Sequence, residues 1–157
     1  MFLHDLFSPE YIKVNMEAQD KDEAFEELVD YFCQVSGLNI REEVLNALKT
    51  REAKMSTGIQ KGIAIPHGKT SAVNSVKGVV GISKKGIDYD SLDGEPVYLL
   101  FLIIAPLKDA EIHLRMLKRI AEMLENPQFY IDLQSQSDAA GAYKVISKYE
   151  DIFIALN

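Results

Sequence analysis

The chain has little of what secreted, membrane-spanning or nucleic-acid-binding proteins require. It contains a single cysteine, Cys33, so no internal disulfide can form and nothing indicates an oxidising compartment. Its 24 acidic and 17 basic residues give a net charge of −7 without any basic cluster, which argues against DNA or RNA as the ligand. The most apolar run, residues 97–105, is about half the length of a membrane-spanning helix, and the short, acidic N-terminus is not a secretory signal. We therefore expect a cytoplasmic protein without membrane insertion.

Several common catalytic motifs are also absent. The sequence has no Gly-rich loop followed by Lys and Ser or Thr, and no dinucleotide fingerprint, so a bound nucleotide is not indicated. No serine lies in a nucleophile elbow, which argues against that class of hydrolase. Of the three histidines, His4 is expected to be structural, and His67 and His113 lie too far apart to make a good zinc site with Cys33. We expect neither a cofactor nor a bound metal.

The hydrophobic pattern predicts a single α/β domain of residues 1–157, in which 47% of the residues are hydrophobic and 26% charged. Asn39, with Glu42 three residues later, is expected to cap the second helix. The continuously apolar strand 97–105 is typical of a strand buried on both faces, which indicates a sandwich with a central mixed, mostly parallel sheet flanked by helices on both faces. The expected elements are an extended stretch at 11–16, helices at 20–37, 39–51, 109–124, 129–133 and 138–148, and strands at 62–65, 76–82 and 97–105.

The segment most informative about function is residues 51–69, which places His67 between Pro66 and Gly68. Pro66 suits the end of a strand and fixes the backbone before the histidine, while Gly68 removes a side chain that could crowd the ring. We therefore expect an exposed imidazole that is held in place. A neutral imidazole, with a reference pKa of about 6.5, offers one ring nitrogen as a nucleophile near neutral pH. The other nitrogen needs an acceptor that the sequence does not identify, and in isolation this histidine could equally be an ordinary residue at a strand exit.

His113 and Arg51 strengthen the functional interpretation. His113 falls at the start of the helix after strand 97–105, and His67 ends another strand, so an α/β topology can bring both to the sheet edge where ligands bind. A helix N-terminus favours an anion, and the guanidinium of Arg51 suits phosphate oxygens. Taken singly, His113 could be a solvated helix residue and Arg51 a surface residue; with His67 they indicate a phosphoryl relay between proteins. Further candidates for holding the phosphate are the hydroxyls and amides of Ser56, Thr57 and Gly58.

At these residues the chain resembles the enzyme IIA domains of the bacterial phosphoenolpyruvate-dependent phosphotransferase system, in the fructose, mannitol and nitrogen class (type 2). The signature of that family reads approximately S-T-G-I-G-x-G-I-A-I-P-H-G after an Arg-Glu pair. Here Arg51 and Glu52 precede residues 56–68, which read STGIQKGIAIPHG. The later family pattern of an apolar strand, a proline and a His-Leu pair is present as LLFLIIAP and His113-Leu114. The resemblance covers essentially the whole chain.

The resemblance implies specific roles and partners. His67 is implied to be the phosphorylated histidine, a candidate tele-phosphohistidine, His113 the second active-site histidine, and Arg51 the residue that steadies the phosphoryl group. The implied donor is an HPr-type phosphocarrier protein, and the acceptor in transport members is a cysteine of a IIB domain. One departure is Gln60, where the family usually has Gly or Ala. If that position has a positive φ, Gln adds strain on the order of 1 kcal/mol.

Two roles within this family remain open. One is a fructose or mannitol transport subunit that donates to a IIB cysteine; the other is a nitrogen-type regulatory protein that binds target proteins according to its phosphorylation. The sequence contains no IIB domain, HPr-like domain or membrane segment, so we expect a free-standing subunit, as nitrogen-type members usually are. The run His67-Gly68-Lys69 also resembles the nitrogen-type pattern. These features favour the regulatory role.

Overall fold

One mixed sheet forms the centre of the computed structural model, which describes residues 1–157. Its strands lie in the order β1-β5-β6-β3-β2, and β4 also pairs with β6. The pairings β1–β5, β3–β6 and β4–β6 are parallel, whereas β5–β6 and β2–β3 are antiparallel, which confirms the α/β class with a mixed, mostly parallel sheet. The strands are β1 (Ile12–Lys13), β2 (Gly58–Gln60), β3 (Ile63–Ala64), β4 (His67–Lys69), β5 (Lys77–Ile87) and β6 (Val97–Ala105).

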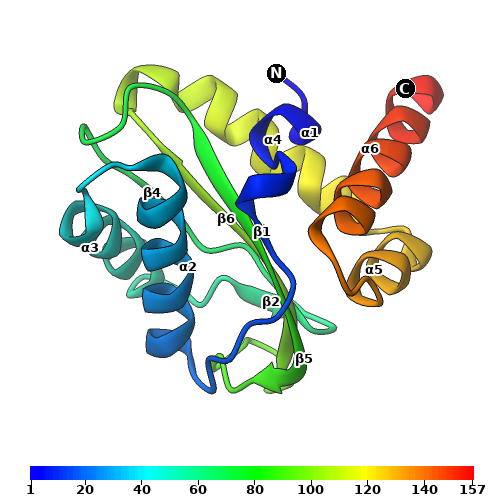
Figure 1. The fold of residues 1–157 in the computed structure, drawn as a ribbon, viewed down its shortest axis with the longest axis horizontal. Helices are drawn as coiled ribbons and strands as arrows, with labels where there is room; N and C mark the ends of the chain where they lie inside the picture. Colours follow the sequence, from blue (N-terminus) through cyan, green and yellow to red (C-terminus); the bar gives the residue numbers. More distant parts are fainter.

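Helices cover both faces of this sheet, with α2 and α3 on one side and α1, α4, α5 and α6 on the other (Figure 1). Alternate residues of β6 point into the two cores, Phe101 towards the side of α4 and Leu102 towards the side of α2. This is why β6 is apolar at every position. None of the helices is both long and apolar enough to cross a membrane. The helices are α1 (Leu3–Leu6), α2 (Lys21–Ser36), α3 (Arg41–Glu52), α4 (Ala110–Met123), α5 (Pro127–Gln134) and α6 (Ala139–Leu156), with short 3-10 turns η1 (Pro9–Tyr11) and η2 (Leu107–Asp109).

The connection between α2 and α3 differs in one respect from its prediction. Gly37 ends α2 in the left-handed conformation, with a φ of 75°, as a glycine after a helix is expected to do. The capping box predicted from Asn39 and Glu42 is wrong, because α3 begins at Arg41 and Ile40 occupies the capping position. Glu42 lies one residue inside the helix, where its carboxylate accepts a hydrogen bond from the Arg41 guanidinium at 2.9 Å.

The segment between α3 and β3 is extended where strain was expected. Gln60 ends β2, which pairs antiparallel with β3, and its φ is not positive, so the strain predicted at Gln60 is absent. The positive φ values fall on the next two residues, Lys61 at 51° and Gly62 at 81°. Glycine adopts such values freely, so the unfavourable backbone conformation belongs to Lys61. The amide of Lys61 donates to the Asp93 carboxylate at 2.9 Å, which holds this turn.

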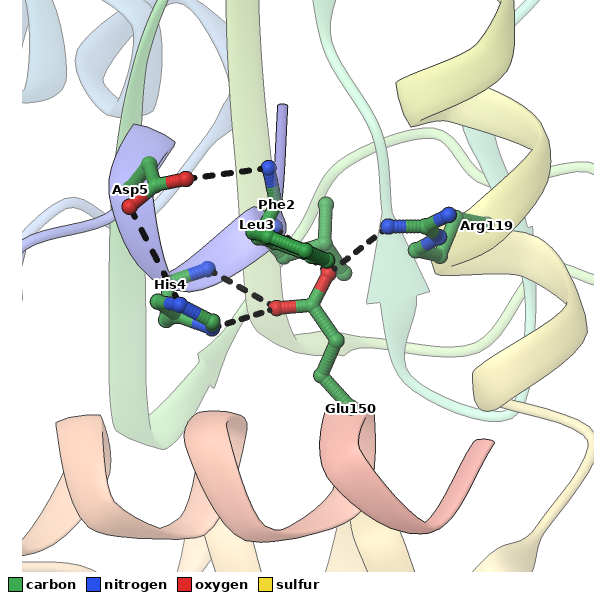
Figure 2. Close-up of polar contacts among 6 residues, drawn as sticks. All are labelled: Phe2, Leu3, His4, Asp5, Arg119 and Glu150. Carbon is green, nitrogen blue, oxygen red and sulfur yellow. Dashed lines mark hydrogen bonds and ion pairs between the residues drawn. The ribbon is translucent and has the colours of Figure 1, made fainter. Parts of the chain in front are cut away.

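A buried carboxylate joins the two ends of the chain (Figure 2). Glu150 of α6 is 0% exposed, and its oxygens accept hydrogen bonds from the Leu3 amide at 2.6 Å, the His4 amide at 3.1 Å and His4 Nδ1 at 2.8 Å. The guanidinium of Arg119, on α4, donates to the same carboxylate at 3.1 Å. Helices α1, α4 and α6 are thus joined at one charged group, and α4 is the helix that carries His113. His4 belongs to this network, in keeping with the structural role expected for it.

Candidate functional site

His67 lies at the start of β4, beside the carboxyl end of β6. It pairs with Ile103 in parallel register, and the carbonyl of Pro66 accepts a hydrogen bond from Ile103 N at 3.0 Å. The prediction that His67 ends a strand is therefore wrong in detail: the strand is interrupted before His67 and resumes there. A proline has no amide to donate, but its carbonyl still accepts, so pairing with β6 continues through it. Because β6 ends at Ala105 and α4 begins at Ala110, His67 and the first turns of α4 meet at one edge of the sheet.

The rings of His67 and His113 lie together at this edge. Their centroids are 5.6 Å apart and the ring planes meet at 78°, an edge-to-face arrangement. His113 is only 2% exposed, so it is not the solvated helix residue that its position alone would allow. His67 is half-buried, less exposed than expected, because the ring of His113 lies against it. The convergence of the two histidines, inferred from the order of strands and helices, is present in the structure.

A backbone carbonyl fixes the tautomer of His67. Its Nδ1 lies 2.8 Å from the carbonyl oxygen of Ile65. A carbonyl oxygen only accepts, so Nδ1 must carry the proton and Nε2 must keep its lone pair when the ring is neutral. The acceptor that the sequence left unidentified is therefore the residue two positions earlier in the chain. The free Nε2 is the nucleophilic atom of this ring.

Burial and neighbouring charges keep both rings neutral at neutral pH. The pKa of His67 is lowered below 6.5, mainly by burial and also by the positive charges of Arg51 and Lys69. The hydrogen bond to the Ile65 carbonyl and the negative charge of Glu52 raise this pKa in part. Burial, together with the charges of His67 and Lys69, lowers the pKa of His113 to about 4. The Nε2 atom of His113 is buried without a hydrogen-bond partner in the protein. A buried polar atom left unpaired is unfavourable, so a ligand that bonds to it gains free energy.

A cavity of about 740 Å³ lies over the two rings, between α3, β4 and α4. Its charged lining residues are Arg51, Lys54 and Lys69, which are cationic, and Glu43, which is acidic. The surroundings of the cavity are therefore positive although the whole chain has a net charge of −7. Such a concentration of one sign of charge in a hollow attracts anions.

The predicted site residues divide into two groups. Arg51, His67 and His113 all line this cavity, whereas the run from Ser56 to Gly58 does not. The guanidinium of Arg51 also donates to the carbonyl of Met55 at 2.8 Å. Thr57 is 3% exposed, and its amide and hydroxyl both donate to a neighbouring carboxylate. The phosphate-binding role of Ser56, Thr57 and Gly58 remains a prediction.

Two features of the site were not predicted from the sequence. Lys69 lines the cavity, and because it follows His67 by two residues in a strand, both side chains lie on the same face of the sheet. Gly68 has a role beyond the one expected. A Cβ at this position would lie 2.7 Å from backbone atoms of Ala47, so the glycine admits α3 against β4 and does not merely clear space for the ring. Only the packing of α3 on β4 could have shown this.

Comparison with known proteins identifies the family. A family model described as "Phosphoenolpyruvate-dependent sugar phosphotransferase system, EIIA 2" matches residues 5–149. The chain belongs to this family. It is therefore a phosphocarrier of the phosphotransferase system, built on the type 2 EIIA fold.

Relatives from both branches of the family are similar to this chain. A nitrogen regulatory protein of Bradyrhizobium diazoefficiens is 34% identical over 147 residues, which are 94% of this chain and 95% of the relative. A fructose-specific EIIABC component of Bacillus subtilis is 33% identical over 150 residues, 96% of this chain but only 24% of that much longer protein. Among solved structures, the nitrogen regulatory protein IIA-Ntr of Neisseria meningitidis superposes with a TM-score of 0.84 at 27% identity, covering 92% of this chain and 98% of that one. These identities do not separate the transport branch from the regulatory branch.

Proposed function

We propose that His67 takes a phosphoryl group onto Nε2 from an HPr-type phosphocarrier protein in the cytoplasm and passes it to a second protein. The observation that supports this most strongly is the hydrogen bond from Nδ1 to the Ile65 carbonyl, which leaves the Nε2 lone pair free on a neutral ring. In the first transfer that lone pair forms a bond to phosphorus, while the bond between phosphorus and the donor breaks and its electron pair leaves with the donor. The second transfer is the same exchange with the acceptor protein as nucleophile.

In this proposal, His113 and Arg51 stabilise the transferring group without forming bonds to phosphorus. The ring of His113 lies beside the reactive ring, and its buried, unpartnered Nε2, with the neutral ring in the Nε2–H tautomer, donates a hydrogen bond to a phosphoryl oxygen. Arg51, together with Lys54 and Lys69, supplies positive charge around the cavity. This charge stabilises the negative charge on the oxygens of the transferring phosphoryl group. Groups that are already in place need no reorganisation during the transfer, which is how such a site lowers the barrier.

The proposal is tested by phosphorylation from purified components. Incubation with phosphoenolpyruvate, enzyme I and HPr is expected to add one acid-labile phosphoryl group to the wild-type chain and none to His67→Ala. His4→Ala, which removes the histidine of the Glu150 network, serves as the control and is expected to be labelled like the wild type. Labelling of His67→Ala at the wild-type level would disprove the assignment.

The partner that receives the group decides between the two branches. The fructose-specific relative is an EIIABC component, which suggests a IIB domain as the acceptor in the transport branch. The relatives named nitrogen regulatory proteins suggest a regulatory role, for which we propose target proteins that bind one phosphorylation state only. We favour the regulatory branch because the run His67-Gly68-Lys69 resembles the nitrogen-type pattern. Capture experiments with phosphorylated wild type and His67→Ala test this choice, and rapid transfer from phosphorylated His67 to a IIB cysteine, sufficient for sugar uptake, would contradict it.

A further inference from the structure

The side chain of Glu52, the last residue of α3, is almost completely buried and fully engaged in hydrogen bonds. This side chain is 7% exposed, and its Oε2 lies 3.2 Å from Lys21 Nζ. One oxygen accepts from the Thr57 amide at 2.7 Å, and the other accepts from the Thr57 hydroxyl at 2.5 Å and the Tyr89 hydroxyl at 3.3 Å. Charge-assisted bonds from several directions hold a carboxylate in one position. Nothing in the phosphoryl-transfer chemistry described above uses this group.

A series of hydrogen bonds leads from Glu52 to the reactive ring. Thr57, whose amide donates to Glu52, accepts at its own carbonyl from Ile65 N at 3.0 Å. The carbonyl of Ile65 in turn accepts from His67 Nδ1 at 2.8 Å. Each group in the series orients the next, and the series ends at the nitrogen that determines the tautomer of His67.

A second connection leads from Glu52 to the cationic side of the site. Arg51 precedes Glu52 in the last turn of α3, and its guanidinium donates to the carbonyl of Met55 at 2.8 Å. Met55 lies inside the loop that the bonds between Glu52 and Thr57 close. Loss of those bonds would free this loop, and with it the carbonyl that holds the Arg51 side chain.

We propose that Glu52 is a positioning residue for phosphoryl transfer: it holds the His67 ring and the Arg51 guanidinium in place, and Thr57 acts through Glu52 and is not a ligand of the phosphoryl group. This inference rests on the proposed function of His67. Both donors of Thr57 are already committed to Glu52, and the residue is 3% exposed, so it has none left for a phosphate. The charge of Glu52 adds a second effect, because it raises the pKa of His67 and so opposes Arg51.

The variant Glu52→Gln tests the positioning role, since it keeps the shape of the side chain but removes its charge and one acceptor. We expect kcat for phosphoryl transfer to fall on the order of tenfold while KM for the phosphorylated donor stays within about twofold, because the site is misaligned and not blocked. The NMR titration of the His67 ring should move to lower pH. The control is Glu42→Gln, which removes an exposed carboxylate from the same helix. It should leave kcat and the NMR titration of His67 unchanged.

A double-mutant cycle separates the two possible roles of Thr57. If Thr57 acts through Glu52, Thr57→Val lowers kcat in the wild-type background but has little further effect in Glu52→Gln. Thr57→Ser, which keeps the hydroxyl, should restore the rate. Equal effects of Thr57→Val in both backgrounds would show that Thr57 contacts the phosphoryl group independently and would overturn the proposal. Wild-type kcat and wild-type titration in Glu52→Gln would overturn it as well.

One further readout keeps the proposal testable without phosphoryl transfer. If Glu52→Gln does not fold, the ¹⁵N chemical shifts of His67 in Glu52→Asp decide, because the shorter side chain draws the carboxylate back from the Thr57 amide. A loss of the single Nδ1–H tautomer supports the proposal, and unchanged shifts reject it. These ring measurements need no phosphoryl donor. They therefore distinguish failure of this inference from failure of the proposed function, which is tested by the labelling of His67→Ala.

Discussion

The rings of His67 and His113 meet edge to face, with 5.6 Å between their centroids. His67 is the first residue of β4, and His113 is the fourth residue of α4. Each ring contributes to the burial of the other, and a positive charge on His67 would lower the pKa of His113. The pair is therefore neutral in the resting protein. One ring offers a nucleophilic Nε2, and the other a buried Nε2 without a partner.

Removal of the second ring should slow transfer without abolishing it. In His113→Ala the nucleophile and its tautomer remain, but one group that stabilises the transferring charge is lost, so we expect transfer to fall about 100-fold. Rapid-quench measurement of phosphoryl transfer from the donor protein provides the rate. Complete loss in a folded His113→Ala, equal to that of His67→Ala, would mean that the two histidines have been assigned the wrong roles.

The buried histidine should make stability depend on pH. The pKa of His113 is lowered to about 4 in the folded protein from 6.5, so between these values the unfolded state binds a proton that the folded state does not. The free energy of unfolding should therefore fall as the pH drops through this window. His113→Gln, which cannot titrate, should lose less stability over the same range. Urea unfolding at several pH values measures the difference, and parallel curves for both proteins would contradict the account.

The contact between α3 and β4 predicts the effect of a methyl group at Gly68. A Cβ there would lie 2.7 Å from backbone atoms of Ala47, which cannot move as a flexible side chain does. Gly68→Ala should destabilise the protein by about 1–3 kcal/mol and slow transfer, because α3 carries Arg51. The additional substitution Ala47→Gly should not restore stability, since the contacts with the main chain remain. Thermal unfolding of the single and double variants is the measurement, and a full rescue by Ala47→Gly would be the contrary result.

The Glu150 network predicts a large loss of stability far from the cavity. Glu150→Ala leaves the buried amide of Leu3 and the charge of Arg119 without their partner, and we expect a loss of about 3–5 kcal/mol in the free energy of unfolding. Asp151→Ala, an exposed carboxylate at the next position, is the control. Urea denaturation of both variants checks this. A cost below about 1 kcal/mol would show that the network contributes little.

The layers of the fold and the meeting of the two histidines could be predicted because they follow from local patterns. The apolar run of β6 indicates a strand buried on both faces. The sheet edge where strands end and the next helices begin was where His67 and His113 could converge, and they do so although His67 begins β4 and does not end a strand. These inferences needed only the spacing of residues along the chain.

The remaining features depend on contacts between distant segments or on the path of the backbone. Glu150 bonds to an amide 147 positions away, and no local pattern marks that pairing. The Ile65 carbonyl was not identified as the acceptor because its direction is set by the resumption of pairing with β6 after Pro66. The hydrogen bonds from Thr57 to the Glu52 carboxylate were not predicted, because the two residues come together only when the loop between them is folded.

The ring nitrogen that carries the phosphoryl group is the strongest test of the assignment of His67 Nε2 as the nucleophile. The hydrogen bond from His67 Nδ1 to the Ile65 carbonyl leaves only Nε2 free. NMR of ¹⁵N-labelled protein phosphorylated through HPr, kept at alkaline pH, measures which ring nitrogen is coupled to phosphorus. We expect coupling to Nε2 of His67, with the Nδ1 proton retained. Coupling to Nδ1 of His67, or to either nitrogen of His113, would contradict it.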